Sequence, residues 1–279
     1  MYDTPRPEPR VIVRPEKGTD NWQFLLSKWH YPDEGHFYEK PVDGIEDFED
    51  GELIWGVVVT GFGKEKDDES DKWQTASLDF VRNKFLPFLK KHLDHEPSLD
   101  VTADYSKEIN LLFKIWREAM GTYTFHEIEM NYCGIEAETY LTLLAKNGKL
   151  RRLDLNGIWP LGAKNVVMTY IASTQDPILT LNKKNRLDID KELFDLMIDK
   201  FIKGNFNYIR NMCGELKVDP GYMKSVYAER LITPGEQGNG TYTWKSPAIC
   251  RSNFEIRHKR KCCLKVGVEV SIYSEGYLC

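Results

Sequence analysis

The sequence lacks long apolar runs and has no excess of basic charge. No stretch approaches the roughly 20 apolar residues that a transmembrane helix requires, and the first residues have no apolar core of the signal-peptide type. The net charge is −5, whereas binding to nucleic acid or to anionic membranes requires a basic surface. We therefore expect a protein of the cytoplasm or the nucleus that has no membrane partner.

Cysteine is also scarce, and its spacing is irregular. The six cysteines suit free thiols better than a disulfide framework. Cys262 and Cys263 are adjacent, so they lack the spacer of a zinc ribbon. His92, His95 and Glu96 come closest to a metal-ligand cluster if they share a helix, because residues three apart lie on one face. Since no further ligand is evident, we interpret them as surface residues and expect no metal and no cofactor.

Catalytic motifs are missing from the sequence. It contains no Gly-x-Gly-x-x-Gly, no phosphate loop, no Gly-x-Ser-x-Gly and no His-Glu-x-x-His. Glu129 and Asp154 could lie side by side on adjacent strands as catalytic carboxylates do, but we interpret them as the exposed positions between apolar strand residues. We predict a protein that is not an enzyme. The alternative is an enzyme whose site can be recognised only in space.

A repeated pattern occupies the middle of the chain. Five segments carry two apolar residues separated by one other residue, which is the alternation of a half-buried strand. They are residues 99–101, 128–130, 153–155, 179–181 and 216–218. Between them, apolar residues recur at helical spacing, as do Ile109, Leu112, Phe113 and Trp116. The pattern predicts that the five strands lie side by side, parallel and in sequence order.

This pattern predicts an α/β fold, a divergent leucine-rich-repeat-like arc of parallel strands and helices closed by a C-terminal antiparallel β element. Residues 150–155 fit the Leu-x-x-Leu-x-Leu core of such a repeat, and an ordinary α/β sheet without an arc is the alternative. We expect three segments. They are an N-terminal extended and strand segment with an acidic loop (1–75), the repeat array (76–220) and a β-rich cap (221–279). Within the first segment, residues 21–30 suggest a short helix and residues 53–62 a strand.

Residues 148–160, the Leu-Thr-Leu strand at 179–181 and the helix pattern at 187–204 carry a family resemblance. In this order they resemble a nematode-expanded family of F-box-associated proteins with divergent leucine-rich repeats. The resemblance implies that the repeats bind a protein target while an F-box grips a Skp1-type adaptor. The residues before Leu53 contain no recognisable F-box, so we expect no adaptor binding of micromolar affinity or better. A diverged ubiquitin-ligase substrate receptor is an alternative.

The polar residues that flank the buried strand positions form the candidate site for a protein partner. They are Asp100, Glu127, Glu129, Arg152, Asp154, Asn156, Thr180 and Lys217. Most are charged, which predicts a polar, salt-sensitive interface. Arg152 and Asp154 should point away from the core, while Leu153 and Leu155 point into it. Trp159, at a strand-to-helix corner, is expected to be a packing residue rather than an exposed anchor.

A basic run near the C-terminus gives the alternative function, RNA binding. It contains Arg257, Lys259, Arg260 and Lys261, and Tyr242 and Trp244 are nearby aromatics for stacking on bases. A solvated hairpin tip explains the same run without any function, because strand geometry would divide its charges between two faces.

Overall fold

The structure is a computed structural model that groups the chain into two units, Met1–Tyr140 and Leu141–Cys279. It describes residues 10–16, 19–30, 38–42, 44–48, 51–61, 73–121, 123, 125–160, 162–175, 177–181, 187–204, 208–236, 239–245, 252–262 and 265–274. The boundary between the units falls inside the expected segment 76–220. Among these residues, no helix is long and apolar enough to cross a membrane.

The first unit is a mixed α/β structure. Its strands are β1 (Arg10–Pro15), β2 (Trp22–His30), β3 (Tyr38–Val42), β4 (Ile54–Val59), β5 (Gln74–Ala76), β6 (Leu93–Val101) and β7 (Glu127–Asn131). Its helical segments are η1 (Ile45–Asp47), α1 (Leu78–Phe80), the π-helical turn η3 (Val81–Phe85), α2 (Leu86–His92), α3 (Lys107–Met120) and α4 (Ile135–Lys146), which runs into the second unit. The strand order is β7-β6-β4-β1-β2-β3, and β5 also pairs with β2.

Parallel pairing in the first unit joins β1 to β4, β4 to β6 and β6 to β7, whereas β2 pairs antiparallel with β1, β3 and β5. The expected parallel pairing of residues 99–101 with 128–130 is therefore confirmed. The strand expected at 53–62 is confirmed by β4. The helix expected at 21–30 is wrong, because these residues form β2. Their apolar side chains Phe24 and Leu26 alternate toward one face, as strand geometry requires.

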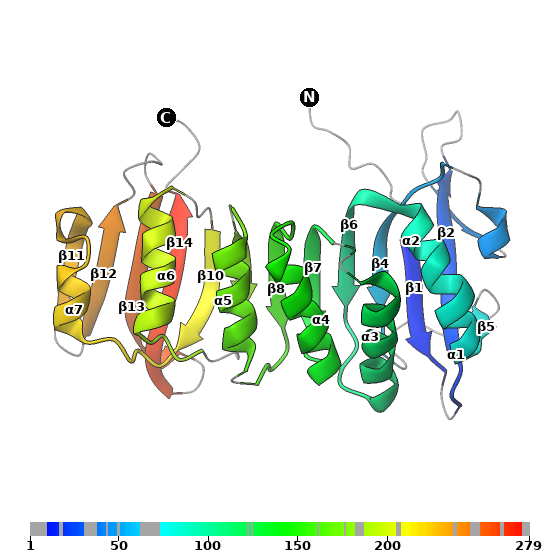
Figure 1. Ribbon diagram of the computed structural model, residues 1–279. Helices are drawn as coiled ribbons and strands as arrows, with labels where there is room; N and C mark the ends of the chain where they lie inside the picture. The colour runs from blue at the N-terminus through cyan, green and yellow to red at the C-terminus, as the bar shows by residue number, and fades with distance from the viewer. Residues whose placement is uncertain are drawn as a thin grey trace. The chain divides into compact units, whose positions relative to one another are not determined.

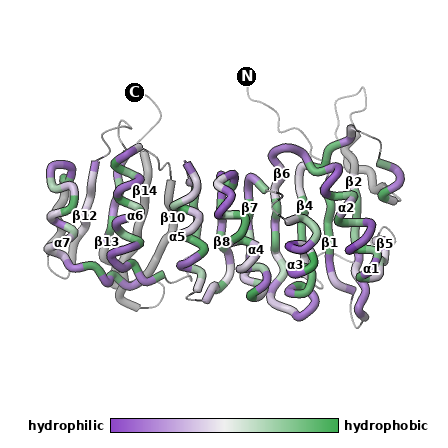
Figure 2. Tube along the Cα trace, in the orientation of Figure 1, coloured by the Kyte–Doolittle hydropathy of each residue, from purple (hydrophilic) through white to green (hydrophobic). Residues whose placement is uncertain are grey.

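The core of the first unit lies between its strands and helices. Figure 1 shows α2 and α3 over one face of the strands, and in Figure 2 polar and apolar stretches alternate along α3. The apolar residues of the predicted α3 pattern are all buried. The hydroxyl of Ser106 accepts the N–H of Ile109 at 3.1 Å and so caps the helix. Leu99, Val101 and Ile128 fill the strand side of this core.

The second unit is also mixed α/β, with parallel strands beside an antiparallel element. Its elements are β8 (Arg152–Asn156), α5 (Ala163–Ser173), β9 (Ile178–Leu181), α6 (Lys191–Ile202), β10 (Tyr208–Gly214), α7 (Pro220–Ser225), η4 (Ala228–Arg230), β11 (Leu231–Glu236), β12 (Asn239–Lys245), β13 (Ser252–Cys262) and β14 (Lys265–Ser274). The strand order is β8-β9-β10-β14-β13-β12-β11. Strands β8, β9 and β10 pair in parallel, and the remaining pairs are antiparallel. The expected pairing of 153–155 with 179–181 and the antiparallel C-terminal element are confirmed.

The strand expected at 216–218 is wrong. The neighbour of β9 is β10, and Leu216 makes only an isolated bridge with Ile189. The register of β10 against β14 shifts between Ile209 and Met212. Such an irregularity breaks the period-two alternation by which a strand is recognised in a sequence, and this explains why β10 was missed.

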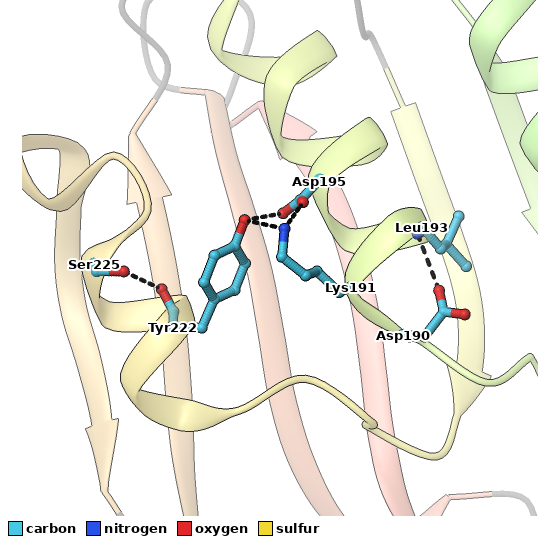
Figure 3. A network of polar contacts seen from close by, with 6 residues as sticks. All are labelled: Asp190, Lys191, Leu193, Asp195, Tyr222 and Ser225. Carbon is cyan, nitrogen blue, oxygen red and sulfur yellow. Dashed lines mark hydrogen bonds and ion pairs between the residues drawn. The ribbon is translucent and has the colours of Figure 1, made fainter.

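Helix α7 is held on α6 by a network of polar contacts, shown in Figure 3. The hydroxyl of Tyr222 donates to Asp195 Oδ1 at 2.7 Å and accepts a hydrogen bond of the same length from Lys191 Nζ. Beneath this layer, Trp244 donates its indole N–H to the Val226 carbonyl at 3.0 Å. The ring centroid of Trp244 also lies 5.6 Å from that of Phe194 on α6. These contacts hold residues 220–226, which follow β10, against α6.

Candidate partner-binding strand face

In the first unit, charged side chains line the face of β6 and β7 that is turned away from α2 and α3. The parallel register places Asp100 beside Glu129 and Ser98 beside Glu127. These residues alternate with the buried Leu99, so they point to the opposite face. Glu127 and Glu129 are exposed there. Both residues therefore belong to one polar strip across two strands.

Electrostatic repulsion marks this strip. Partial burial raises the pKa of Asp100, and the neighbouring charge of Glu129 raises it further, while Arg10 acts in the opposite direction. Asp100 Oδ1 is buried and accepts no hydrogen bond. Like charges directly opposite each other on neighbouring strands destabilise a sheet. A cation brought by a partner would reduce this repulsion.

In the second unit, the corresponding face of β8 carries an ion pair. Arg152 donates from Nε and Nη2 to Asp154 Oδ2 at 3.0 and 2.7 Å. The side chain of Arg152 is 48% exposed, but that of Asp154 is only 9% exposed, and its Oδ1 is buried without a hydrogen-bond partner. The expectation that Asp154 is an exposed position is therefore wrong. Arg152, whose side chain is longer, holds the carboxylate of Asp154 from two positions earlier in β8.

Two of the remaining site residues lie on the second unit's strands, and one does not. Thr180 is the register partner of Asp154 and is half-buried, as is Asn156 at the end of β8. Lys217 is exposed and its Nζ lies 3.1 Å from Glu215 Oε2, outside every strand. Its assignment to the strand face is wrong, because the strand of this repeat ends at Gly214.

Trp159 follows β8 and is buried, with 5% of its surface exposed. Its indole N–H donates to the Asn156 carbonyl at 2.8 Å, which fixes the ring across the turn that leaves the strand. The expectation of a packing residue is confirmed. Glu129 and Asp154, the alternative pair of catalytic carboxylates, belong to different units, and each has the neighbours described above.

The histidines of the candidate metal cluster do not share a helix. His92 ends α2 and is buried, with Nδ1 3.0 Å from the Glu52 carbonyl oxygen, whereas His95 and Glu96 belong to β6. His95 Nδ1 lies 2.6 Å from Oδ1 of the buried Asp94, a contact that the sequence pattern did not reveal. Within the described ranges, no three His, Cys, Asp or Glu residues could hold a metal ion together.

The aromatic residues proposed for stacking on RNA bases are buried. Tyr242 is 1% and Trp244 0% exposed, so neither ring can contact a base, and this part of the expectation is wrong. Both rings face the helix side of β12, where they form the core with Phe194 and Phe254. Alternation along β12 puts both aromatics on that one face.

The basic run itself lies at the end of β13, next to the turn into β14. Arg257 is exposed, and its Nη2 lies 2.6 Å from Oε1 of the buried Glu255. The side chains of Lys259, Arg260 and Lys261 lie outside the described residues. Comparison of the chain with models of known protein families, with curated proteins and with solved structures finds no match.

Proposed function

We propose that this protein is an intracellular, non-enzymatic scaffold that binds a protein partner through its strand faces. The observation that carries the proposal is the exposed pair Glu127 and Glu129. Both alternate with buried apolar residues of β7, on the face turned away from α2 and α3. Charged residues at such positions add nothing to the core. They favour a partner with complementary charge and make its binding sensitive to salt.

The partner chemistry follows from the charges of each face. On the first unit, Asp100 and Glu129 lie side by side and favour a lysine or arginine of the partner. On the second unit, Arg152 is held by Asp154 and half exposed, which suits a carboxylate of the partner. Each face would therefore select its own partner group by charge rather than bind proteins in general.

The proposal includes a leucine-rich-repeat-like architecture and a relation to F-box-associated proteins. The parallel pairs β6–β7 and β8–β9 support it, since each follows the strand–helix order of such repeats. A role as a ubiquitin-ligase substrate receptor stays an alternative. We expect no stable complex with a Skp1-type adaptor, because the sequence shows no recognisable F-box. One-to-one co-elution on gel filtration would contradict this.

The test compares two charge variants of the full chain. The double variant Glu127→Lys/Glu129→Lys changes the strand face, and Glu118→Lys is a control away from that face, since Glu118 is exposed on α3. Each protein is used for affinity purification from native tissue, with mass spectrometry and sequencing of any retained RNA. Proteins that the wild type and the control retain, but the double variant loses, identify the partner.

Thermal melting accompanies the purification as a check that the variants are folded. Thermal melting of all three proteins should agree within a few degrees, because exposed substitutions usually cost less than about 0.5 kcal/mol. Retention of every partner by the double variant would contradict the proposal. RNA that is retained by the double variant but lost after Arg257→Glu would favour the RNA-binding alternative.

A further inference from the structure

The strand face of the first unit continues beyond β6 and β7 onto β4 and β1. The parallel register aligns Ile12, Val58, Asp100 and Glu129 in one row across the four strands. Register partners of neighbouring parallel strands point to the same side of a sheet. Val58 lies between two buried valines of β4, so the row is turned away from the helix side of the core. The acidic strip and strands β1 and β4 therefore share one face.

The middle of this face is apolar and partly exposed. Ile12 on β1 and Val58 on β4 are register partners, and both are half-buried although strands flank them on each side. Gly56, two residues earlier on the same face, adds no side chain to β4, and Cγ of Arg10 lies 4.0 Å from the position that a Cβ would take there. The side chains of β4 therefore project less than those of β1. An apolar stripe of a partner can rest on Ile12 and Val58.

A positive group is held in place beside this apolar pair. Arg14 follows Ile12 on the same face of β1, and its Nε donates to Gln23 Oε1 at 2.9 Å. Its guanidinium carbon lies 3.7 Å from the centroid of the Trp73 ring. The two contacts fix the plane of the guanidinium, and within the described residues they use only one of its three nitrogens for a hydrogen bond. A guanidinium fixed in this way is suited to bind a carboxylate through its remaining N–H groups.

A negative group lies on the other side of the apolar pair. Glu127 on β7 is exposed, and it shares this face because the register joins it to Ser98 and, through Ser98, to Gly56. Neighbouring strands are about 4.8 Å apart, so three spacings put about 14 Å between β1 and β7. Across the four strands the face therefore changes from positive through apolar to negative.

We propose that this face binds an amphipathic α-helix of a protein partner, which specifies the strand-face function proposed above and rests on it. The helix lies along β4 with its apolar stripe on Ile12 and Val58. One flank carries an aspartate or glutamate that pairs with Arg14, and the other carries a lysine or arginine that pairs with Glu127. A helix with its side chains is about 10–12 Å wide, so charged side chains on its two flanks can reach both groups.

Backbone hydrogen bonding favours a helix over an extended segment. The hydrogen bonds of a sheet lie in its plane, so an extended segment on the sheet face would bury N–H and C=O groups on Ile12 and Val58 without partners. A helix satisfies these groups internally and still presents an apolar stripe. Helices α2 and α3 cover the other face of this unit in the same manner (Figure 1). Charge complementarity on both flanks then selects among amphipathic helices.

The experiment measures binding of designed helical peptides to the full chain by fluorescence anisotropy. Each peptide has about 18 residues, a leucine stripe and two polar flanks. The two flanks are glutamate and lysine in the mixed peptide, and both lysine, both glutamate or both glutamine in the others. We expect the mixed peptide to bind at least about tenfold more tightly than the glutamine peptide, because only the mixed peptide forms both charge pairs. The mixed peptide with glutamine in place of its leucines should not bind.

Double-mutant cycles assign each flank to a residue. Replacing the glutamate flank by glutamine should weaken binding to the wild type about tenfold, but binding to Arg14→Met by less than about twofold. Replacing the lysine flank should behave in the same way with Glu127→Gln. Arg82→Met removes an exposed arginine of the helical segment η3 and is the matched control, which should keep the full effect of both flanks.

A further pair of variants tests the apolar contact. Ile12→Thr/Val58→Thr keeps both residues β-branched and should weaken binding of the mixed peptide about tenfold, because the hydroxyls interrupt the apolar contact. Leu111→Gln changes an exposed apolar residue of α3 and should leave the binding unchanged. Thermal melting of each variant shows whether it is folded.

Different results decide the helix and the strand-face function. Equal binding of the mixed and glutamine peptides, tighter binding of either single-charge peptide, or no saturable binding of any peptide would each overturn the helix. The strand-face function is contradicted instead when Glu127→Lys/Glu129→Lys retains every partner in the purification. A partner that this double variant loses, but Ile12→Thr/Val58→Thr retains, would overturn the helix and leave the strand-face function standing.

Discussion

Strands β6 and β8 have the same local pattern and different electrostatics. Strand β6 ends with Ser98, Leu99, Asp100 and Val101. In β8, Arg152 is followed by Leu153, Asp154 and Leu155. The apolar positions are buried in both strands. The aspartates differ, because Arg152 binds Asp154 from two positions earlier, whereas Ser98 occupies that position in β6 and Asp100 faces Glu129. The period-two pattern therefore fixes the burial of the apolar positions, whereas neighbouring side chains decide the burial and the electrostatics of the aspartates.

The largest effect on stability should come from the buried leucine that precedes the aspartate in each strand. Leu99→Ala and Leu153→Ala each remove a buried side chain and leave a cavity, so each should lower the free energy of unfolding by about 2–5 kcal/mol. Urea denaturation followed by circular dichroism measures both. Ile158→Ala, at a position that is 70% exposed, is the control and should cost little. A cost below about 1 kcal/mol at Leu153 alone would show that the strands are not equivalent.

A smaller effect should separate the two aspartates. Arg152→Met leaves the carboxylate of Asp154 buried without the two hydrogen bonds from Arg152, which should cost about 1–3 kcal/mol. Arg10→Met is the matched change near Asp100, and it should cost less than about 0.5 kcal/mol because Arg10 is exposed.

A second variant tests the reason for that difference. Replacing both partners, in Arg152→Met/Asp154→Leu, should recover most of the loss, because no uncompensated charge then stays buried. The same urea denaturation measures all of these variants. Equal costs for Arg152→Met and Arg10→Met would contradict the contrast between the two strands.

The smallest effect depends on pH. The pKa of Asp100 is raised above its ordinary value of 3.8, so the folded state holds this proton more tightly than the unfolded state. Its contribution to stability is therefore present below pH 3.8 and is lost as the pH rises through the folded pKa. Asp100→Asn should raise the stability at pH 7 by about 0.2–1 kcal/mol and change it little at pH 3. Asp104→Asn is the exposed control, and a loss of stability for Asp100→Asn at pH 7 would contradict the repulsion.

Periodicity predicted the elements whose burial is regular. The alternation at 99–101, 128–130, 153–155 and 179–181 marked strands correctly, and the helical spacing of Ile109 and Trp116 marked α3. It failed at β2, where the pattern was interpreted as a helix, and at β10, where the register shift breaks the alternation. Short segments fit both periods, and pairing with neighbouring strands decides between them.

The predictions for the candidate site were likewise correct where burial alternates along a strand and wrong where it depends on neighbouring elements. Alternation correctly put Glu127, Glu129 and Thr180 between buried neighbours. It did not show that Asp154 is covered, or that Tyr242 and Trp244 belong to the core, because burial on a sheet face depends on adjacent strands and on the helices above them.

The sequence by itself determined the α/β class, the parallel pairs β6–β7 and β8–β9 and the antiparallel C-terminal strands. Each of these follows from local periods of two or 3.6 residues, which the chain carries without reference to its partners. Tertiary structure alone decided that Asp100 lies beside Glu129 and that Asp154 is buried. These depend on residues distant in the chain, because charge repulsion and burial are set by whichever side chains the fold brings within a few ångströms.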